Sequence, residues 1–299
     1  MKPQTVELKF HIVKSILSKV GFVAKNVIFI PKFSKKTLKR NNFFYEPIEK
    51  RKVEFRFGSY LVTTIDYKNP LIKEVQKLRY ESFFGKSNET HYDEDEFDKV
   101  CDHLIVIDKS KSKNQLVGTY RLLIKPKNIS KVDFYSQTEF SIDKLYGDAN
   151  ISLLEAGRSC VLDGYRDGRI IRLLWRALAT YIVKNRIDLI FGCASFPSSD
   201  YKRFIPQLSY LHNFHAPPRQ FNTLPLQHLK ADYKIIKKQV LKEEEMFRSL
   251  PPLIKAYIRA GAWVGQGAIV DKKFNTTDVL IILKSTKIMK KYSQLAVNQ

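Results

Sequence analysis

Apolar and polar residues follow a regular pattern from residue 59 onward, alternating between short runs typical of strands and longer periods typical of helices. Strands are predicted where β-branched and aromatic residues gather between polar turns, at 60–67, 103–108, 115–124, 151–161, 188–195 and 277–283. Helices are predicted at 70–84, 169–184, 201–211 and 226–248. The clearest apolar helix face is made by Ile170, Leu174, Leu178, Tyr181 and Ile182. This alternation predicts an α/β domain in which helices cross a mixed central sheet.

The first 58 residues have a different character. They form a basic arm in which Leu8, Ile12, Ile16, Leu17 and Val20 recur at helical spacing opposite several lysines. Such a helix suits an anionic membrane surface, and it equally suits docking on the main domain through its apolar stripe. We therefore divide the chain into a basic arm at 1–58 and a folded α/β domain at 59–299.

Composition narrows the class of protein. The chain has 299 residues, of which 44% are hydrophobic, and no segment approaches the roughly 20 apolar residues of a membrane-spanning helix. Three cysteines without metal-site spacing and an N-terminus unlike a signal peptide predict a cytoplasmic protein. The formal net charge of +22 favours an anionic partner, which by charge alone is nucleic acid, anionic lipid or an acidic protein.

A basic turn separates the strand at 151–161 from the helix at 169–184. The N–H groups at the start of a helix lack partners inside the helix and attract phosphate. Arg166 and Arg169 add positive charge, and Gly168 lets the backbone approach a ligand. These three residues are the predicted phosphate-binding elbow, although many α/β folds have such a turn without binding anything.

Several motifs together resemble one enzyme family. They are LRYESFF (78–84), DEFDKVCDHLIVID (95–108), LVGTYRLL (116–123), EAGRSCV (155–161), YRDG (165–168), LLWRALATYIV (173–183), LIFGCASF (189–196) and LPPLIKAYIRAGAWV (250–264). In this combination the chain resembles the L-ornithine Nα-acyltransferases of the GNAT superfamily over roughly residues 59–285. The resemblance implies a GNAT-like α/β fold with a splayed central sheet. It also implies transfer of a 3-hydroxyacyl chain from acyl carrier protein to ornithine, which gives lyso-ornithine lipid.

The elbow departs from the pattern of GNAT enzymes that use coenzyme A, which favour small residues there. Arg169 and Ile170 follow the single Gly168, and this bulkier turn fits the single phosphodiester of carrier-bound phosphopantetheine better than a pyrophosphate. The predicted partners are acyl carrier protein, which is acidic as a family and complements the basic chain, and ornithine. No permanently bound cofactor and no metal ion are expected.

Amide formation requires a base, because an amino acid's α-amine is largely protonated at neutral pH. Glu155 is the predicted general base, acting directly or through water, with burial raising its pKa toward the working range. Arg158 is predicted to hold the substrate carboxylate or to order Glu155. These side chains would face opposite sides of a regular strand, so they require a bulge, which would also free a backbone N–H, that of Val161, for the thioester oxygen. The alternative is a Glu155–Arg158 ion pair that only fixes the strand.

A second group is Arg79 and Phe83 on the helix at 70–84 with Asp95 and Asp98 in the acidic loop that follows. Together with Glu155 and Arg158 they also resemble the N-acyl-homoserine-lactone synthases. The prediction is that this group binds the amine substrate and that the acidic loop receives ornithine's second ammonium group. A solvated, mobile loop is the alternative.

Other chemistries have weaker support. Cys160 lacks a nearby histidine, so a buried structural side chain is favoured over an acyl-cysteine. An acyl-homoserine-lactone-type synthase acting on S-adenosylmethionine remains the nearest rival function. A nucleic-acid-binding module or a catalytically idle scaffold is the rival of another class, but the basic residues are dispersed and no nucleic-acid-binding motif is present, so no nucleic acid is expected.

Overall fold

A computed structural model describes residues 52–111, 113–129, 132–147 and 150–288. The predicted amphipathic helix and nearly all of the basic arm lie outside these ranges. Within them, no helix combines the length and the apolar character needed to span a membrane.

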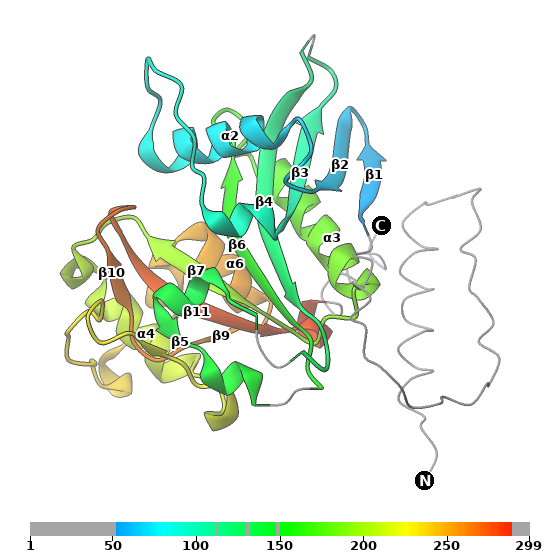
Figure 1. The fold of residues 1–299 in the computed structure, drawn as a ribbon. Helices are drawn as coiled ribbons and strands as arrows, with labels where there is room; N and C mark the ends of the chain where they lie inside the picture. The colour runs from blue at the N-terminus through cyan, green and yellow to red at the C-terminus, as the bar shows by residue number, and fades with distance from the viewer. Residues whose placement is uncertain (1–51, 112, 130–131, 148–149, 289–299) are drawn as a thin grey trace, which may run out of the picture. The chain divides into compact units, whose positions relative to one another are not determined.

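A nine-stranded mixed sheet forms the centre of the described chain (Figure 1). Its strand order is β1-β2-β3-β4-β6-β7-β11-β10, with β9 paired to β11, and every pairing except β6–β7 is antiparallel. The strands are β1 Glu54–Phe57, β2 Tyr60–Ile65, β3 Asp102–Asp108, β4 Gln115–Lys125, β6 Leu153–Val161, β7 Leu189–Phe196, β9 Trp263–Val264, β10 Ile269–Asp271 and β11 Thr276–Lys284. A separate pair joins β5 Phe140–Ser141 to β8 Leu224–Pro225. The sheet thus begins at Glu54, ahead of the domain boundary suggested by the sequence.

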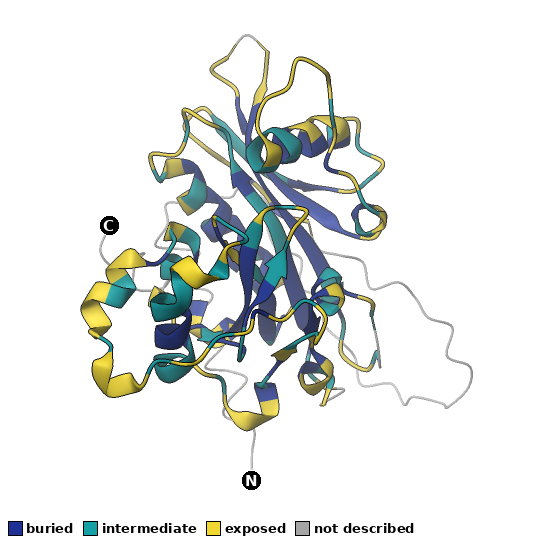
Figure 2. Ribbon diagram, turned by 90° about the vertical axis from the view of Figure 1, so that its left-hand side faces the viewer, coloured by how far each residue is buried: buried dark blue, intermediate teal, exposed yellow. Residues whose placement is uncertain are grey.

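Two helices cover opposite faces of the sheet (Figures 1 and 2). Helix α2 (Ile72–Phe84) packs with β2, β3 and β4 in one apolar cluster, whereas α3 (Arg169–Lys184) lies on the other face, where Ile170 and Leu174 crowd Gly118 of β4. All five apolar residues predicted to form the inner face of α3 are at most 1% exposed. The remaining helices are α4 Ile205–Phe214, α5 Glu243–Ser249 and α6 Pro252–Arg259.

One predicted helix is wrong. Residues 226–242 run without α-helix, and only Glu243–Ser249 is α-helical in the predicted stretch 226–248. Tertiary hydrogen bonds replace helical ones there: Ala231 N–H donates to the Ala268 carbonyl, and Ile236 N–H donates to the Ser209 hydroxyl. The segment is held against β10 and α4, so tertiary contacts override its helical propensity.

The sheet splays between its two parallel strands, as the family resemblance implied. Strands β6 and β7 pair over only three positions, ending at Glu155 opposite Phe191, and then diverge. At the point of divergence, Gly192 of β7 lies close to the backbone of Ala156 on β6. A Cβ atom built there would lie 2.3 Å from the Ala156 carbonyl oxygen. A residue without a side chain is therefore needed where the gap opens.

The contact between Gly192 and the Ala156 carbonyl leaves no room for a side chain. Gly192→Ala should destabilise the protein by about 1–3 kcal/mol, because the added methyl group overlaps backbone that cannot rotate away. Gly157→Ala is the matched control, since a Cβ added on this neighbouring strand meets nothing within 4 Å, and it should cost less than about 0.5 kcal/mol. Equal unfolding midpoints for the two variants in a chemical denaturation series would show that β7 yields freely.

Candidate active site

A cavity of about 470 Å³ opens where β6 and β7 diverge. Its walls come from β4, β6, β7 and the β10–β11 turn, with α2 and α6 at its margins. The polar residues that line it include Arg121, Tyr135, Ser136, Glu139, Glu155, Arg158, Ser159, Cys193, Ser195, Asp271, Thr276 and Asp278. A cavity of this size and mixed lining is typical of a small-molecule site.

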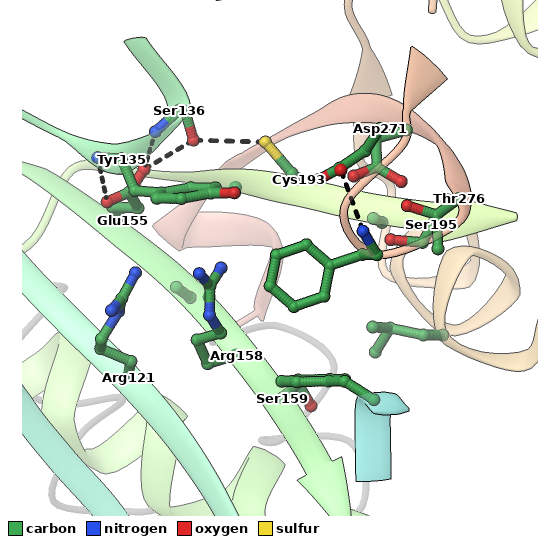
Figure 3. A pocket seen from close by; sticks show the side chains of 18 of the residues that line it. Arg121, Tyr135, Ser136, Glu155, Arg158, Ser159, Cys193, Ser195, Asp271 and Thr276 are labelled. Atoms are coloured by element: carbon green, nitrogen blue, oxygen red, sulfur yellow. Dashed lines mark hydrogen bonds between the residues drawn. The ribbon is translucent and has the colours of Figure 1, made fainter. Parts of the chain in front are cut away.

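Glu155 of β6 lines this cavity, and its carboxylate also caps the start of a short helix from another segment. Its Oε2 accepts the Tyr135 N–H at 3.0 Å, and its Oε1 accepts the Ser136 N–H at 2.7 Å and the Ser136 hydroxyl at 2.6 Å (Figure 3). These N–H groups begin the 3₁₀ helix Tyr135–Thr138 and lack partners within it. Burial raises the pKa of Glu155, and the hydrogen bonds from Ser136 and Tyr135 oppose that rise. The Ser136 hydroxyl is therefore the side-chain group with which Glu155 can exchange a proton directly.

The predicted bulge is present at Arg158. Between the pairs Thr119–Cys160 and Arg121–Gly157 the register shifts, and Arg158 has a positive φ of 50°. Side chains three apart on a regular strand face opposite sides, yet Glu155 and Arg158 both line the cavity (Figure 3). The left-handed backbone costs about 1–2 kcal/mol, so the surrounding structure must hold it in place.

Aromatic rings and aspartates together hold Arg158. The guanidinium carbon lies 4.4 Å from the Tyr135 ring centre and 4.8 Å from that of Phe274. Its Nε and Nη2 atoms form ion pairs with Asp93 at 3.1 Å and Asp95 at 3.2 Å. The described ion pairs of Arg158 thus join it to the acidic loop and not to Glu155. Its Nη1 atom takes part in neither of these two pairs.

Val161 ends β6 beyond the bulge. Leu162 N–H donates to the Val117 carbonyl at 2.9 Å, and N–H groups of successive residues point to opposite edges of an antiparallel strand. The Val161 N–H therefore points away from β4, toward the side on which β7 diverges. Ser159, and not Val161, is the last β6 residue that lines the cavity, so the role predicted for Val161 stays a prediction.

The predicted elbow joins β6 to α3. Gly168 has a φ of +91°, which a side chain would disfavour, and α3 begins at the next residue. Both arginines are exposed and paired locally: Arg166 with Asp163 at 3.0 Å, and Arg169 with Asp167 at 2.6 Å. Asp167 also accepts the Arg169 N–H at 2.9 Å. A phosphate here would compete with both aspartates, and phosphopantetheine binding stays a prediction.

The acidic loop is occupied by arginines. Arg79 and Asp98 are both fully buried and pair at 2.8 Å, while Arg79 also pairs with Asp93 at 2.7 Å. Arg121 pairs with Asp95 at 2.5 Å and with Asp98 at 2.9 Å. Burial alone would raise the pKa of Asp98, but Arg79 and Arg121 outweigh it and lower the pKa to about 2.

This network changes the interpretation of the second predicted group. Arg79, Asp95 and Asp98 do not line the cavity. Asp98 pairs with Arg79 and Arg121, and Asp95 pairs with Arg121 and Arg158, so amine binding by this group stays a prediction. Phe83 does line the cavity and packs edge-on against Phe274 at 5.6 Å. The loop is solvated only in part, because Asp93 and Asp98 are buried whereas Tyr92, Glu94 and Glu96 are exposed.

Sequence reasoning missed several cavity residues. Ser136 and Glu139 come from an irregular segment without periodicity, and only the fold brings them to β6. Arg121 and Asp278 carried a usable signal, since each is a charged residue inside an apolar strand and must find a buried counterpart. The Cys160 thiol does not line the cavity, and burial raises its pKa to about 12, which argues against an acyl-cysteine.

This chain matches the profile of a known family, and several similar proteins share one name. The profile of the family described as "Acetyltransferase (GNAT) domain" matches residues 78–176. A protein of Agrobacterium fabrum named L-ornithine N(alpha)-acyltransferase is 41% identical over 233 residues, covering 74% of this chain and 80% of that protein. Proteins with the same name from Brucella abortus (36% identical; 74% and 83% covered) and Rhizobium meliloti (39% identical; 67% and 69% covered) are also similar.

Solved structures are more distant. FeeM, an N-acyl amino acid synthase from uncultured soil microbes, has a TM-score of 0.43 at 10% identity, covering 84% of this chain and all of that chain. The acyl-homoserine-lactone synthase LasI has a TM-score of 0.39 at 14% identity, covering 79% of this chain and 91% of that chain. TM-scores at this level have no bearing on function.

Proposed function

The chain belongs to the family of L-ornithine Nα-acyltransferases, GNAT-fold acyltransferases, and on this premise we propose that it acylates the α-amine of ornithine with a 3-hydroxyacyl chain from acyl carrier protein. The product is then an Nα-(3-hydroxyacyl)-ornithine, a lyso-ornithine lipid. Kinship with curated relatives of that name over most of the chain carries the proposal. A lipid product also favours a peripheral location on the inner face of the cytoplasmic membrane.

Glu155, Ser136 and a main-chain N–H of β6 carry the proposed reaction. The amine nitrogen attacks the thioester carbonyl carbon, and a C–N bond forms while negative charge develops on the carbonyl oxygen. A main-chain N–H at the splayed edge of β6, that of Val161, stabilises this oxygen. The amine proton passes to the Ser136 hydroxyl as that hydroxyl gives its own proton to Glu155. The C–S bond then breaks, and the leaving carrier thiolate takes the proton that Glu155 gained, which returns Glu155 to its ionised form.

Arg158 positions the amino acid. Its guanidinium lies over the Tyr135 and Phe274 rings, and Nη1 lies outside its described ion pairs. Because Nε and Nη2 are paired with Asp93 and Asp95, the N–H groups of Nη1 are the donors assigned to the α-carboxylate. The α-carboxylate at Arg158 leaves the α-amine near Ser136 and Glu155.

The donor is the second element of the proposal. A basic chain of net charge +22 attracts an acidic carrier protein, and such attraction raises the association rate more than it tightens the final complex. The phosphodiester of the pantetheine arm is assigned to the elbow of Arg166, Gly168 and Arg169.

The test is transfer by purified protein to labelled ornithine, with S-adenosylmethionine as a parallel acceptor. Donors are 3-hydroxyacyl carrier protein and the matching coenzyme A thioester. Acylated ornithine is expected, with a KM for the carrier protein that rises with salt. Acylation of S-adenosylmethionine alone would refute the acceptor, while a salt-independent KM, or equal use of coenzyme A, would refute the carrier assignment.

A further inference from the structure

The cavity has an acidic end that the reaction described above does not use. Glu139 follows the 3₁₀ helix Tyr135–Thr138, Asp271 ends β10 and Asp278 lies on β11. All three line the cavity, and one carboxylate oxygen from each lies within 4.8 Å of the others. The fold thus brings together three acids from three separate segments of a strongly basic chain.

No basic side chain in the described part of the chain forms an ion pair with these acids, although Asp271 Oδ1 accepts the Lys273 and Phe274 N–H groups. Glu139 is 4% exposed and Asp278 is 5% exposed, and none of the described ion pairs includes Glu139, Asp271 or Asp278. Glu139 Oε2 and Asp278 Oδ1 have no hydrogen-bond partner among the described residues. An unpaired buried carboxylate is costly, so this cluster is poised for a cation that enters the cavity.

Charge is arranged along the cavity with opposite signs at its two ends. Arg121 and Arg158 extend from β4 and β6 on the same side of the cavity as Glu155, whereas Asp271 lies with Thr276 and Ser195 on the opposite side (Figure 3). An α-amino acid whose carboxylate meets Arg158 extends its side chain toward the acids. A neutral side chain would leave them unpaired, whereas a terminal ammonium would pair with them.

We propose that Glu139, Asp271 and Asp278 bind the side-chain ammonium of a diamino acid substrate and set the selectivity for it over neutral amino acids. This inference rests on the proposed acylation of ornithine. It assigns the second ammonium group to this cluster, in place of the loop at Asp95 and Asp98 whose charges arginines already neutralise.

The geometry suits an ammonium group. An ammonium nitrogen has three N–H donors, and three oxygens held at about 2.8 Å in tetrahedral directions lie about 4.6 Å apart. The carboxylate oxygens here lie within 4.8 Å of one another. A magnesium or calcium ion draws its oxygens to about 2.0–2.6 Å and takes about six or more of them, which makes a divalent ion the rival occupant for the test.

The first experiment compares ornithine with norvaline, which has the same carbon chain without the terminal amine. Asp278→Asn and Glu139→Gln should each lower the ornithine-to-norvaline ratio of kcat/KM by about 10- to 100-fold, the range for losing a hydrogen bond to a charged group. Glu74→Gln, an exposed carboxylate on α2, is the matched control and should keep the ratio. An unchanged ratio in both cluster variants would overturn the inference while leaving acylation of ornithine intact.

The second experiment measures thermal stability without any acyl donor, so it decides the inference even if no acylation is found. Burial and the neighbouring acid raise the pKa of Glu139 to about 7, and burial raises that of Asp278 to about 6. A carboxyl whose pKa is raised on folding destabilises the fold as pH climbs from its unfolded value through its folded value. Glu139→Gln should therefore raise Tm at about pH 8 and leave it unchanged at about pH 5, where both carboxyls are largely protonated.

The Tm difference between about pH 5 and about pH 8 reports on Glu139 and Asp278 and not on the other groups that face them. Asp271 belongs to the cluster, Arg158 stays charged, and burial raises the pKa values of Cys193 and Tyr135 far above this range. Ornithine should raise the Tm of the unmodified protein more than norvaline does, and Asp278→Asn should abolish that difference. Equal effects of the two amino acids, or a Tm rise with magnesium or calcium that Asp278→Asn removes and ornithine does not reproduce, would overturn the inference.

Discussion

Glu155→Gln is expected to lower kcat by about 100- to 10,000-fold, the usual contribution of a general base. Glutamine cannot take up the proton that the attacking amine must lose. The loss should shrink as pH rises, because a larger share of the amine is then already neutral. Steady-state kinetics across a pH series would measure both effects.

A fall in kcat alone does not separate chemistry from architecture, since Glu155 also accepts the Tyr135 and Ser136 N–H groups. Ser136→Ala is the matched variant: both backbone hydrogen bonds to Glu155 remain, and the hydroxyl that donates to Glu155 and accepts from the Cys193 thiol is removed. It should lower kcat while leaving Tm nearly unchanged. Full activity in Ser136→Ala would exclude the hydroxyl relay, and full activity in Glu155→Gln would leave Glu155 as a helix-capping residue only.

Local pattern predicts most of the sheet and both large helices because each satisfies its own periodicity. The stretch 169–184 is helical over the predicted range, and its apolar face is buried because that face is continuous in the sequence. The stretch 226–248 failed for the converse reason. Its hydrogen bonds go to Ala268 and Ser209, partners that are distant in sequence and that periodicity does not reveal.

In the candidate active site, too, residues from one strand were predictable, whereas residues gathered from several segments were not. Glu155 and Arg158 were predicted from one strand and a bulge, and both do line the cavity. The acids of the opposite end come from three segments, and no spacing links Glu139 to Asp278. Asp95 and Asp98 were assigned to the amine substrate from their resemblance to the N-acyl-homoserine-lactone synthases and from the concentration of acids in a basic chain. The structure pairs them with arginines on α2, β4 and β6, partners that are distant in the sequence.

The arginine–aspartate network transmits the loop's position to the active site. Asp93 bridges Arg79 and Arg158, and Asp95 bridges Arg121 and Arg158. The strained bulge at Arg158 is thus fixed by a loop whose own anchor is Asp98. Loss of that anchor should affect both the fold and the orientation of the guanidinium that meets the substrate.

Asp98→Ala is accordingly expected to destabilise the protein by about 3–5 kcal/mol, the cost of leaving a buried charge without its partner. Asp98 accepts hydrogen bonds from Arg79, Arg121 and Gln76, and neither it nor Arg79 is exposed to water. Glu94→Gln is the control in the same loop, because its ion pair with Lys73 is partly exposed and should contribute less than about 1 kcal/mol. Urea unfolding of both variants would measure the difference.

Acid should reproduce the same loss in the unmodified protein. The pKa of Asp98 is lowered from 3.8 to about 2, so its stabilising contribution is complete above the unfolded value and disappears as pH falls through the folded value. The unmodified protein should lose stability between about pH 4 and about pH 2, and Asp98→Ala should lose less over that interval because this titration is absent. Parallel acid profiles for the two proteins would show that the network's charges titrate as in the unfolded chain, and that packing alone holds the loop against Arg158.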